Sequence, residues 1–207
     1  MKNQYNYTLL FVVLMVVSEP GLVSGQSAFK SKESARKYFE HSLSEDPANA
    51  KNHFDYAMLL FQEFGDTDAA SKHFKIALEL APLQPRWHFI YAILLDQRFN
   101  DAESAKFHYE RALALDSHFT LAHYNYALLL HEKFKDFKDA KKYYENTIIL
   151  DPNFAMAHLH YAVLLKNQLN LRDDALRQYL KAIRLDPRLK TKERNDFFGL
   201  NTPTSLP

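Results

Sequence analysis

Apolar positions along this chain follow helical spacing, in two patterns that take turns. The first pattern places Tyr124, Ala127 and Leu130 on one helix face, because residues three and four apart lie above one another. The second pattern does the same with Ala140 and Tyr144. Polar residues fill the positions between, so both segments should be amphipathic helices. The chain therefore predicts helices that alternate between two types.

Both patterns recur every 35 residues. A Tyr-Ala pair stands at 56–57, 91–92, 126–127 and 161–162. A histidine lies three residues before each of these tyrosines: His53, His88, His123 and His158. An alanine of the second helix type recurs at Ala35, Ala70, Ala105, Ala140 and Ala175. Such a period indicates a repeat array, in which each unit buries its apolar face against its neighbours.

Turn residues mark the boundaries of the repeats. A left-handed cap should end each first helix near Gly65, Asn100, Lys135 and Asn170. Side chains able to cap the second helices follow at Asp66, Asp101 and Asp136. An Asp-Pro pair ends the second helix, because proline disfavours helix at the residue before it. This predicts a half repeat at 26–49 with a single helix at about 31–45, four helix pairs over 50–187, and a tail or degenerate capping helix over 188–207.

With these positions in place, the units resemble tetratricopeptide repeats. Ala127, Ala140, Tyr144 and Pro152 match the small residues, the aromatic and the closing proline of that family, over about 33–187 in all. The resemblance implies an all-α fold, a right-handed superhelical solenoid of antiparallel helix pairs. The chain departs from the family by having histidine where tryptophan is favoured, and by one residue added between the helices.

Composition narrows the function classes. The chain has 26 Lys+Arg and 25 Asp+Glu, a net charge of +1, so it lacks the basic field that gathers nucleic acid. Pentatricopeptide repeats, which read RNA, share the period of 35, but their closing Gly-x-x-Pro-Asp pattern is absent. No cysteine and only 4 glycines leave no thiolate site and no glycine-rich phosphate loop. We expect a protein that is not an enzyme and does not bind nucleic acid.

The N-terminus has the three-part pattern of a secretory signal peptide. Residues 9–17 are nine consecutive apolar residues after a polar start, and cleavage is expected after Gly25. Nine residues are too few to span a bilayer, which takes about 20, so no stable membrane span is expected. The sequence thus predicts residues 1–25 as a signal peptide of a secreted or secretory-pathway protein. The alternative is a cytoplasmic protein with an uncleaved hydrophobic segment.

The resemblance also implies that the first helices line a concave face that binds a partner. The residues assigned to this face are Phe54, Met58, Phe61, Phe89, Ile93, Tyr124, Leu128, His131, Leu159, Val163 and Lys166. Family members that bind chaperone tails hold a terminal carboxylate with Lys and Asn where this chain has Phe54 and Met58, so that clamp is not expected. A face this apolar suits binding of a hydrophobic peptide or helix. The alternative is that part of it is simply core between repeats, and the sequence leaves both open.

The repeated histidines are the most conspicuous polar feature. Equivalent positions of successive repeats lie about 8–10 Å apart, too far for two of them to share a zinc ion with Zn–N bonds of about 2.0–2.1 Å. We expect no metal site and no cofactor, and each histidine to pack between its own two helices with a hydrogen bond to a neighbour. A pH-sensing role is the alternative. Paired acids such as Asp136 and Asp139 should favour helix starts rather than act in acid–base catalysis.

These observations lead to a non-enzymatic scaffold that binds a protein or peptide through its concave face. The alternative is a structural subunit that assembles head to tail into an oligomer or filament. The single helix at 31–45 motivates it, since an apolar strip of Ala35, Tyr38, Phe39 and Leu43 should lie exposed there. The end around Phe197 and Leu200 of another copy could cover this strip, because repeat arrays need covered ends.

Overall fold

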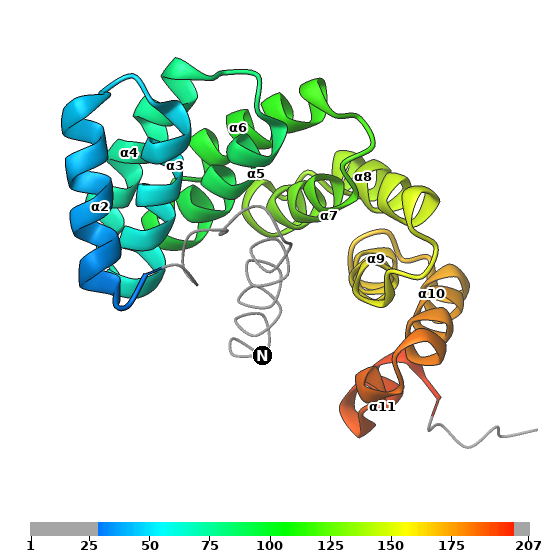
Figure 1. The fold of residues 1–207 in the computed structure, drawn as a ribbon. Coiled ribbons are helices and arrows are strands. Elements are labelled where there is room, and N and C mark those ends of the chain that lie inside the picture. The colour runs from blue at the N-terminus through cyan, green and yellow to red at the C-terminus, as the bar shows by residue number, and fades with distance from the viewer. Residues whose placement is uncertain (1–28, 201–207) are drawn as a thin grey trace, which may run out of the picture. The chain divides into compact units, whose positions relative to one another are not determined.

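The computed structural model describes residues 29–200, which form ten α-helices and no strand (Figure 1). The helices are α2 (Lys32–Glu45), α3 (Ala50–Leu59), α4 (Thr67–Leu80), α5 (Pro85–Leu94), α6 (Ala102–Leu115), α7 (Thr120–Leu129), α8 (Phe137–Leu150), α9 (Ala155–Asn167), α10 (Arg172–Leu185) and α11 (Lys192–Phe198). The all-α fold class is confirmed. The predicted signal peptide over 1–25 lies outside the described residues. Over residues 29–200, every helix is too short or too polar to cross a membrane.

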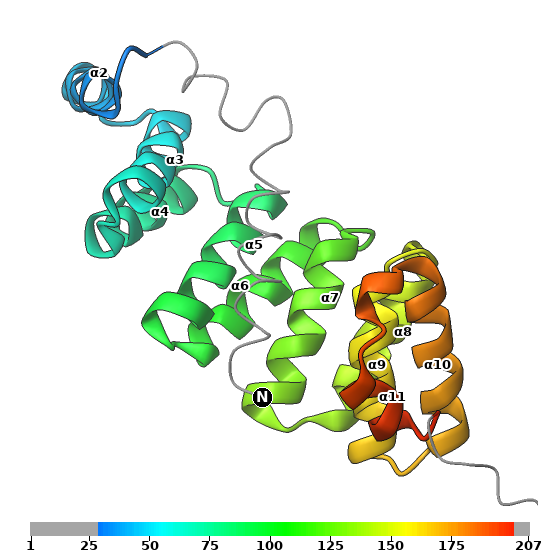
Figure 2. The same ribbon diagram turned by 90° about the horizontal axis from the view of Figure 1, so that it is seen from below.

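The chain divides into two compact units, the first ending at Phe99 and the second beginning at Asn100. In the first unit α3 packs on α2 and on α4, and α4 packs on α5. In the second, α7 packs on α6 and α8, and α9 packs on α8 and α10. The paired helices α3/α4 and α9/α10 lie side by side in both views (Figures 1 and 2). Each unit is thus built from neighbouring helices in chain order.

Repeated alanines lie in the helix core. No part of Ala57, Ala70, Ala127, Ala140 or Ala175 is exposed to solvent. A methyl side chain at these positions allows two helices to approach closely, because interhelical distance follows the size of the contact residues. Their complete burial explains why a small residue recurs every 35 positions.

An aromatic stack joins each second helix to the next first helix within a unit. Tyr126 stacks on Tyr109 with ring centroids 6.0 Å apart, and its hydroxyl donates to Glu110 at 2.6 Å. Tyr161 repeats both contacts with Tyr144, at 6.1 Å, and with Glu145, at 2.7 Å. The same stack recurs in Phe39–Tyr56 and Phe74–Tyr91. Burial and the nearby carboxylates raise the pKa of Tyr126 and Tyr161, so both remain protonated donors.

Three of the first helices end in a π-helix. These segments are Leu60–Phe64, Leu95–Phe99 and Leu130–Phe134. A π-turn closes an i→i+5 hydrogen bond and so holds one residue more than an α-turn. A tetratricopeptide repeat usually has 34 residues, and the repeats of this chain have 35. Because the π-turn holds one residue more, the extra residue lies inside the first helix. The prediction that it lies between the helices is wrong for these three repeats. After α9, which is α-helical to Asn167, the chain instead has a longer turn before α10.

The predicted caps are present in the structure. The backbone is left-handed at the predicted cap residues, with φ of 66° at Gly65, 51° at Asn100, 57° at Lys135 and 53° at Asn170. The carboxylates that follow accept backbone N–H groups of the second helices, Asp66 from Ala69, Asp101 from Ser104 and Asp136 from Asp139. The second helix of every pair but the last therefore begins with an aspartate cap. In the last pair the residue before α10 is Leu171, which makes no side-chain cap hydrogen bond.

The prediction that the first helix exposes an apolar strip is mostly wrong. Ala35 and Phe39 of α2 are buried, whereas Tyr38 is 51% exposed and Leu43 is half-buried. Phe39 stacks on Tyr56 of α3 with centroids 5.7 Å apart, because α2 packs on the helix that follows it. The ring of Phe29 lies 6.2 Å from Phe39 and 5.2 Å from Tyr38.

Candidate binding face of the first helices

The residues assigned to the binding face divide into two groups by burial. Buried side chains are Phe54, Met58, Phe89, Ile93, Tyr124 and Leu159. Half-buried side chains are Phe61, Leu128, His131, Val163 and Lys166. A buried side chain contributes to packing first, so only the second group offers accessible surface in this structure. Their role in partner binding stays a prediction.

In the first unit, the expected face residues pack against the next first helix. Phe54 of α3 stacks on Trp87 of α5, with ring centroids 4.7 Å apart and planes 10° apart. Phe54 also contacts Phe74 of α4 edge to face, with ring centroids 5.3 Å apart. The Arg98 guanidinium lies 5.5 Å from the ring centroid of Phe61, a cation–π contact between the π segments. Phe54 is therefore core between repeats, while Phe61 and Arg98 form an aromatic and cationic surface.

In the second unit, a polar pair lies under the face. The Tyr124 hydroxyl is 2.8 Å from His160 Nδ1, and the two rings stack with centroids 5.8 Å apart. Phe154, the residue before α9, lies 4.7 Å from Tyr124 between ring centroids. Burial lowers the pKa of His160 to about 3, with smaller contributions from the positive charges of His131 and Arg194. His160 is consequently neutral at physiological pH.

His131 lies in the π segment after α7, within electrostatic reach of the same pair. Burial lowers the pKa of His131 to about 4, and the charge of Lys135 adds a smaller effect. Its ring meets Phe137 and Tyr144 edge to face, with centroids 5.9 Å and 6.3 Å apart. Both histidines of this region are therefore uncharged at neutral pH, His160 in the core and His131 half-buried.

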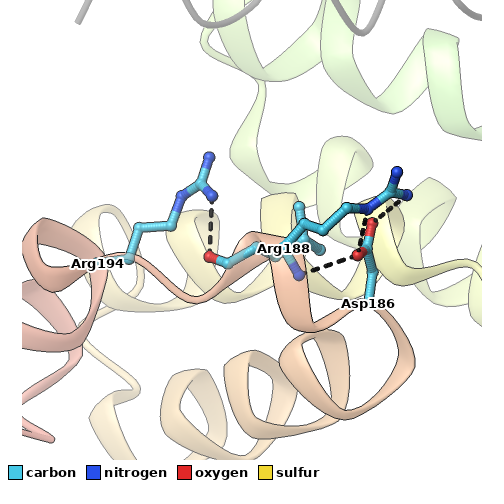
Figure 3. Close-up of polar contacts among 4 residues, drawn as sticks. Asp186, Arg188 and Arg194 are labelled. Carbon is cyan, nitrogen blue, oxygen red and sulfur yellow. Dashed lines mark hydrogen bonds and ion pairs between the residues drawn. The ribbon is translucent and has the colours of Figure 1, made fainter.

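The C-terminal tail places aromatic rings under Lys166 of α9 and adds the cationic side chain of Arg194. The Lys166 ammonium lies 4.2 Å from the ring centroid of Phe197 and 5.7 Å from that of Phe198. Figure 3 shows Arg194, whose Nη1 donates to the Leu189 carbonyl at 2.9 Å. Lys166 is thus held over the aromatic end of α11.

The same close-up shows the tail's ion pair. Arg188 is paired with Asp186 through two guanidinium contacts of 2.9 Å (Figure 3). This pair holds the pKa of the Asp186 carboxyl below its ordinary value. The ion pair lies in the turn between α10 and α11, with Arg188 exposed to solvent.

The repeated histidines connect each first helix to the loop before it. Each Nε2 lies within hydrogen-bond distance of the carbonyl six residues upstream: His53 with Pro47 at 3.1 Å, His88 with Pro82 at 3.0 Å, His123 with Ser117 at 2.9 Å, and His158 with Pro152 at 3.1 Å. Because a carbonyl only accepts, Nε2 is the donor and carries the proton. The expected packing with a hydrogen bond to a neighbour is confirmed.

Two residues of this region escaped the sequence reasoning. Trp87 and His160 were not assigned to the face, yet they contact Phe54 and Tyr124 respectively. The available signal was a break in the repeat, since the position of His160 holds Asp55, Ile90 and Asn125 in the other units. A residue whose type differs from those at the equivalent positions of the other repeats marks a contact specific to its own repeat. The 35-residue period does not predict such a contact.

The partly accessible side chains of this region are apolar, cationic or neutral. They are an aromatic ring at Phe61, the aliphatic Leu128 and Val163, the neutral imidazole of His131, and cations held over rings. Within residues 29–200, no cluster of three or more His, Asp or Glu side chains could hold a metal ion.

Comparison with known proteins agrees with this architecture. Residues 57–118 match the tetratricopeptide-repeat family model. No curated protein sequence matches the chain. A crystal structure of MamA superposes with a TM-score of 0.71 at 19% identity, covering 82% of this chain and 96% of that one. MamA from Desulfovibrio magneticus RS-1 gives a TM-score of 0.67 at 17% identity, covering 78% and 89%.

A third similar structure is YrrB, described as a tetratricopeptide-repeat protein with an unusual peptide-binding site. It superposes with a TM-score of 0.67 at 20% identity, covering 80% of this chain and 82% of that one. At these identities the likeness shows a shared fold. Together with the matching segment, it confirms the resemblance that the repeat positions indicated.

Proposed function

We infer that this chain, which carries tetratricopeptide repeats over residues 57–118 and shares the fold of proteins built from them, is a non-enzymatic scaffold that binds a protein or peptide. The contact surface is the half-buried group on the first helices of the second unit: Leu128, His131, Val163 and Lys166. The observation that carries this proposal is that these four side chains stay partly accessible while Tyr124 and Leu159, assigned to the same face, are buried. A partner with apolar side chains and an acidic or polar flank fits them, because Leu128 and Val163 are aliphatic and Lys166 supplies a cation, which lies over the Phe197 ring.

The likeness to YrrB supports a peptide as the partner, since that protein is described as having a peptide-binding site. The neutral state of His131 supports an apolar contact, because a charged imidazole would have to lose its hydration on binding.

The test is a selection of peptides from a displayed library on the full chain, followed by affinity measurement. We expect the double variant Leu128→Glu with Val163→Glu to weaken the selected peptides more than tenfold, because it puts charge where apolar contact is made. Ile149→Glu is the matched control, since Ile149 on α8 is 74% exposed and lies on a second helix. Unchanged affinity in the double variant, with helical content retained, would contradict this site.

Head-to-tail self-assembly is the second candidate. Its support is the exposure of apolar side chains near the two ends of the described chain, Tyr38 at 51% and Leu200 at 38%. Contact between such ends is heterologous and builds an open fibre unless its rotation closes a ring.

Secretion is proposed from the sequence of residues 1–25. A cleaved signal peptide gives a mature protein that begins at or near Gln26. Mass spectrometry of the protein from its native host tests this, and folded protein retaining Met1 would favour the cytoplasmic alternative.

A further inference from the structure

The outer side of α10 carries basic side chains at regular spacing. Arg177, Lys181 and Arg184 are four and three residues apart, so they lie on one helix face. The buried residues of α10 have the same spacings two positions earlier in the chain: Ala175, Tyr179 and Ala182. Because two residues turn an α-helix by about 200°, the basic face lies opposite the buried one. Arg177 and Arg184 are exposed to solvent, and Lys181 is half-buried.

The other second helices differ from α10 at these three positions. None of them in residues 29–200 has Lys or Arg at all three. The equivalent residues are Lys37, His41 and Ser44 in α2, Lys72, Ile76 and Glu79 in α4, Phe107, Arg111 and Ala114 in α6, and Lys142, Asn146 and Ile149 in α8. The repeat fold therefore does not require three cations on this face, since the other second helices pack without them.

An exposed leucine of α10 takes a position that is acidic in other repeats. Leu180 is 39% exposed and lies on the same face, three residues after Arg177 and four before Arg184. The equivalent Glu110 and Glu145 accept the tyrosine hydroxyl of the following first helix. No such tyrosine follows α10, so position 180 needs no acceptor. An apolar side chain thus lies among the cations where an acid would have partly neutralised them.

Positive charge is concentrated in this end of the chain. Residues 166–200 hold nine Lys and Arg against five Asp and Glu, a net charge of +4, although the whole chain has +1. Two arginines are neutralised, Arg177 by Asp174 and Arg188 by Asp186 (Figure 3 shows the second pair). Four further cations form no ion pair with any residue in 29–200: Lys181, Arg184, Lys190 and Lys192. These four charges are free to attract an anionic partner.

We propose that this basic surface docks the protein on an anionic lipid surface. The basic surface consists of Arg177, Leu180, Lys181, Arg184, Lys190 and Lys192. Anionic headgroups attract exposed Lys and Arg side chains, and an exposed leucine enters the boundary between headgroups and acyl chains. The docking is peripheral, because every helix of residues 29–200 is too short or too polar to cross a membrane.

The chemistry of the free cations favours lipid over a carboxylate-bearing protein. Three of the four unpaired cations are lysines, which are flexible point charges with no fixed partner geometry. The planar guanidinium fork that suits a carboxylate is already occupied by an acid at Arg177 and Arg188. Mobile headgroups therefore match this surface better than one fixed set of carboxylates.

The test is co-sedimentation of the full chain with vesicles of phosphatidylcholine that contain about 30% phosphatidylglycerol. Vesicles of phosphatidylcholine alone give the reference, since the apolar residues 9–17 would bind both kinds alike. We expect at least tenfold stronger binding to the anionic vesicles. This preference should disappear at about 1 M salt, where the Debye length is about 3 Å.

Charge-reversal variants locate the binding surface. Lys181→Glu with Arg184→Glu should weaken binding to anionic vesicles more than tenfold, because two attractive charges become repulsive. The matched control is Lys72→Glu with Lys75→Glu, which makes the same change in net charge at two exposed lysines of α4 and should keep most of the affinity. Leu180→Glu restores the residue of α6 and α8 at this position, so the fold should tolerate it while binding falls about fivefold.

Equal weakening by the two double variants would overturn the proposal, since attraction would then follow net charge rather than this surface. No preference for anionic over neutral vesicles would overturn it as well, and binding to soluble polyglutamate in that case would indicate an acidic protein partner. The outcome is separate from peptide binding, because the proposed peptide surface lies on the first helices. Selected peptides should bind the Lys181→Glu, Arg184→Glu variant with the parent's affinity.

Discussion

A buried neutral histidine contributes to the acid stability of the second unit. His160 has a pKa of about 3 in the folded chain, against an ordinary value of 6.5. Between these values only the unfolded chain binds the proton, so the stability is complete above about pH 6.5 and is lost as pH falls toward 3. We expect the free energy of unfolding to fall by up to about 1.4 kcal/mol per pH unit from this residue.

Urea unfolding at pH values from 7.5 to 4.5 measures this slope. In the variant His160→Gln the slope should be smaller by about one proton, because glutamine does not titrate. His41→Gln is the matched control, since it removes an exposed histidine of α2 by the same substitution. Equal slopes in the parent and His160→Gln would show that His160 is not the buried neutral group.

At the scale of the element, α11 occupies the place of a further first helix. Phe198 stacks on Tyr179 of α10 with ring centroids 4.2 Å apart, as Tyr161 stacks on Tyr144. The Tyr179 hydroxyl of α10 donates to Asn195 Oδ1 of α11 at 2.9 Å, so the direction is opposite to that in the preceding repeat, where Tyr161 of the first helix donates to Glu145 of the second. The tail therefore acts as a cap that covers the aromatic face of the last repeat.

Phe198→Ala should lower the free energy of unfolding by about 2–4 kcal/mol, because it removes a buried ring from this stack. In this variant, the backbone amide hydrogens of residues 192–198 should exchange with solvent faster than those of α7. Leu200→Ala is the control, and at 38% exposure its effect should stay within about 0.5 kcal/mol. An equal loss in both variants would argue against a specific capping contact.

At the scale of the whole molecule, the burial of side chains near both ends bears on self-association. Phe39 and Phe198 are each buried against their own chain, which leaves Tyr38 and Leu200 as the exposed apolar groups there. We expect light scattering on residues 26–207 to give one molecular mass across a concentration series. Growth with concentration that Tyr38→Glu abolishes would instead support the head-to-tail assembly.

Most of the fold could be predicted from the sequence because its signals are local and repeated. Each first helix ends at a residue with left-handed backbone, and in most repeats an aspartate that caps the second helix follows it. Both features depend on only a few neighbouring residues. Gly65 and Asp66 therefore behaved as their positions predicted. The period also located the buried alanines, since every copy meets the same neighbour.

The candidate binding face could be predicted only in outline. Position along the repeat assigns Phe54 and Phe61 alike to the first helix, but Phe54 is covered by Trp87 and Phe61 is not fully covered. Which of two apolar residues is covered depends on the helix packed beside them, and the period carries no information about that.

The sequence by itself determined the helix pairs, their caps and the small residues at the crossings, because those depend on hydrogen bonds and sizes repeated in every unit. Only the tertiary structure decided where the extra residue of the repeat lies, since a π-turn and a longer loop satisfy the same sequence spacing. It also brought His53 to His73 and Tyr124 to His160, contacts across 20 and 36 residues. Such pairs form when packed helices bring side chains within hydrogen-bond distance, which no local pattern encodes.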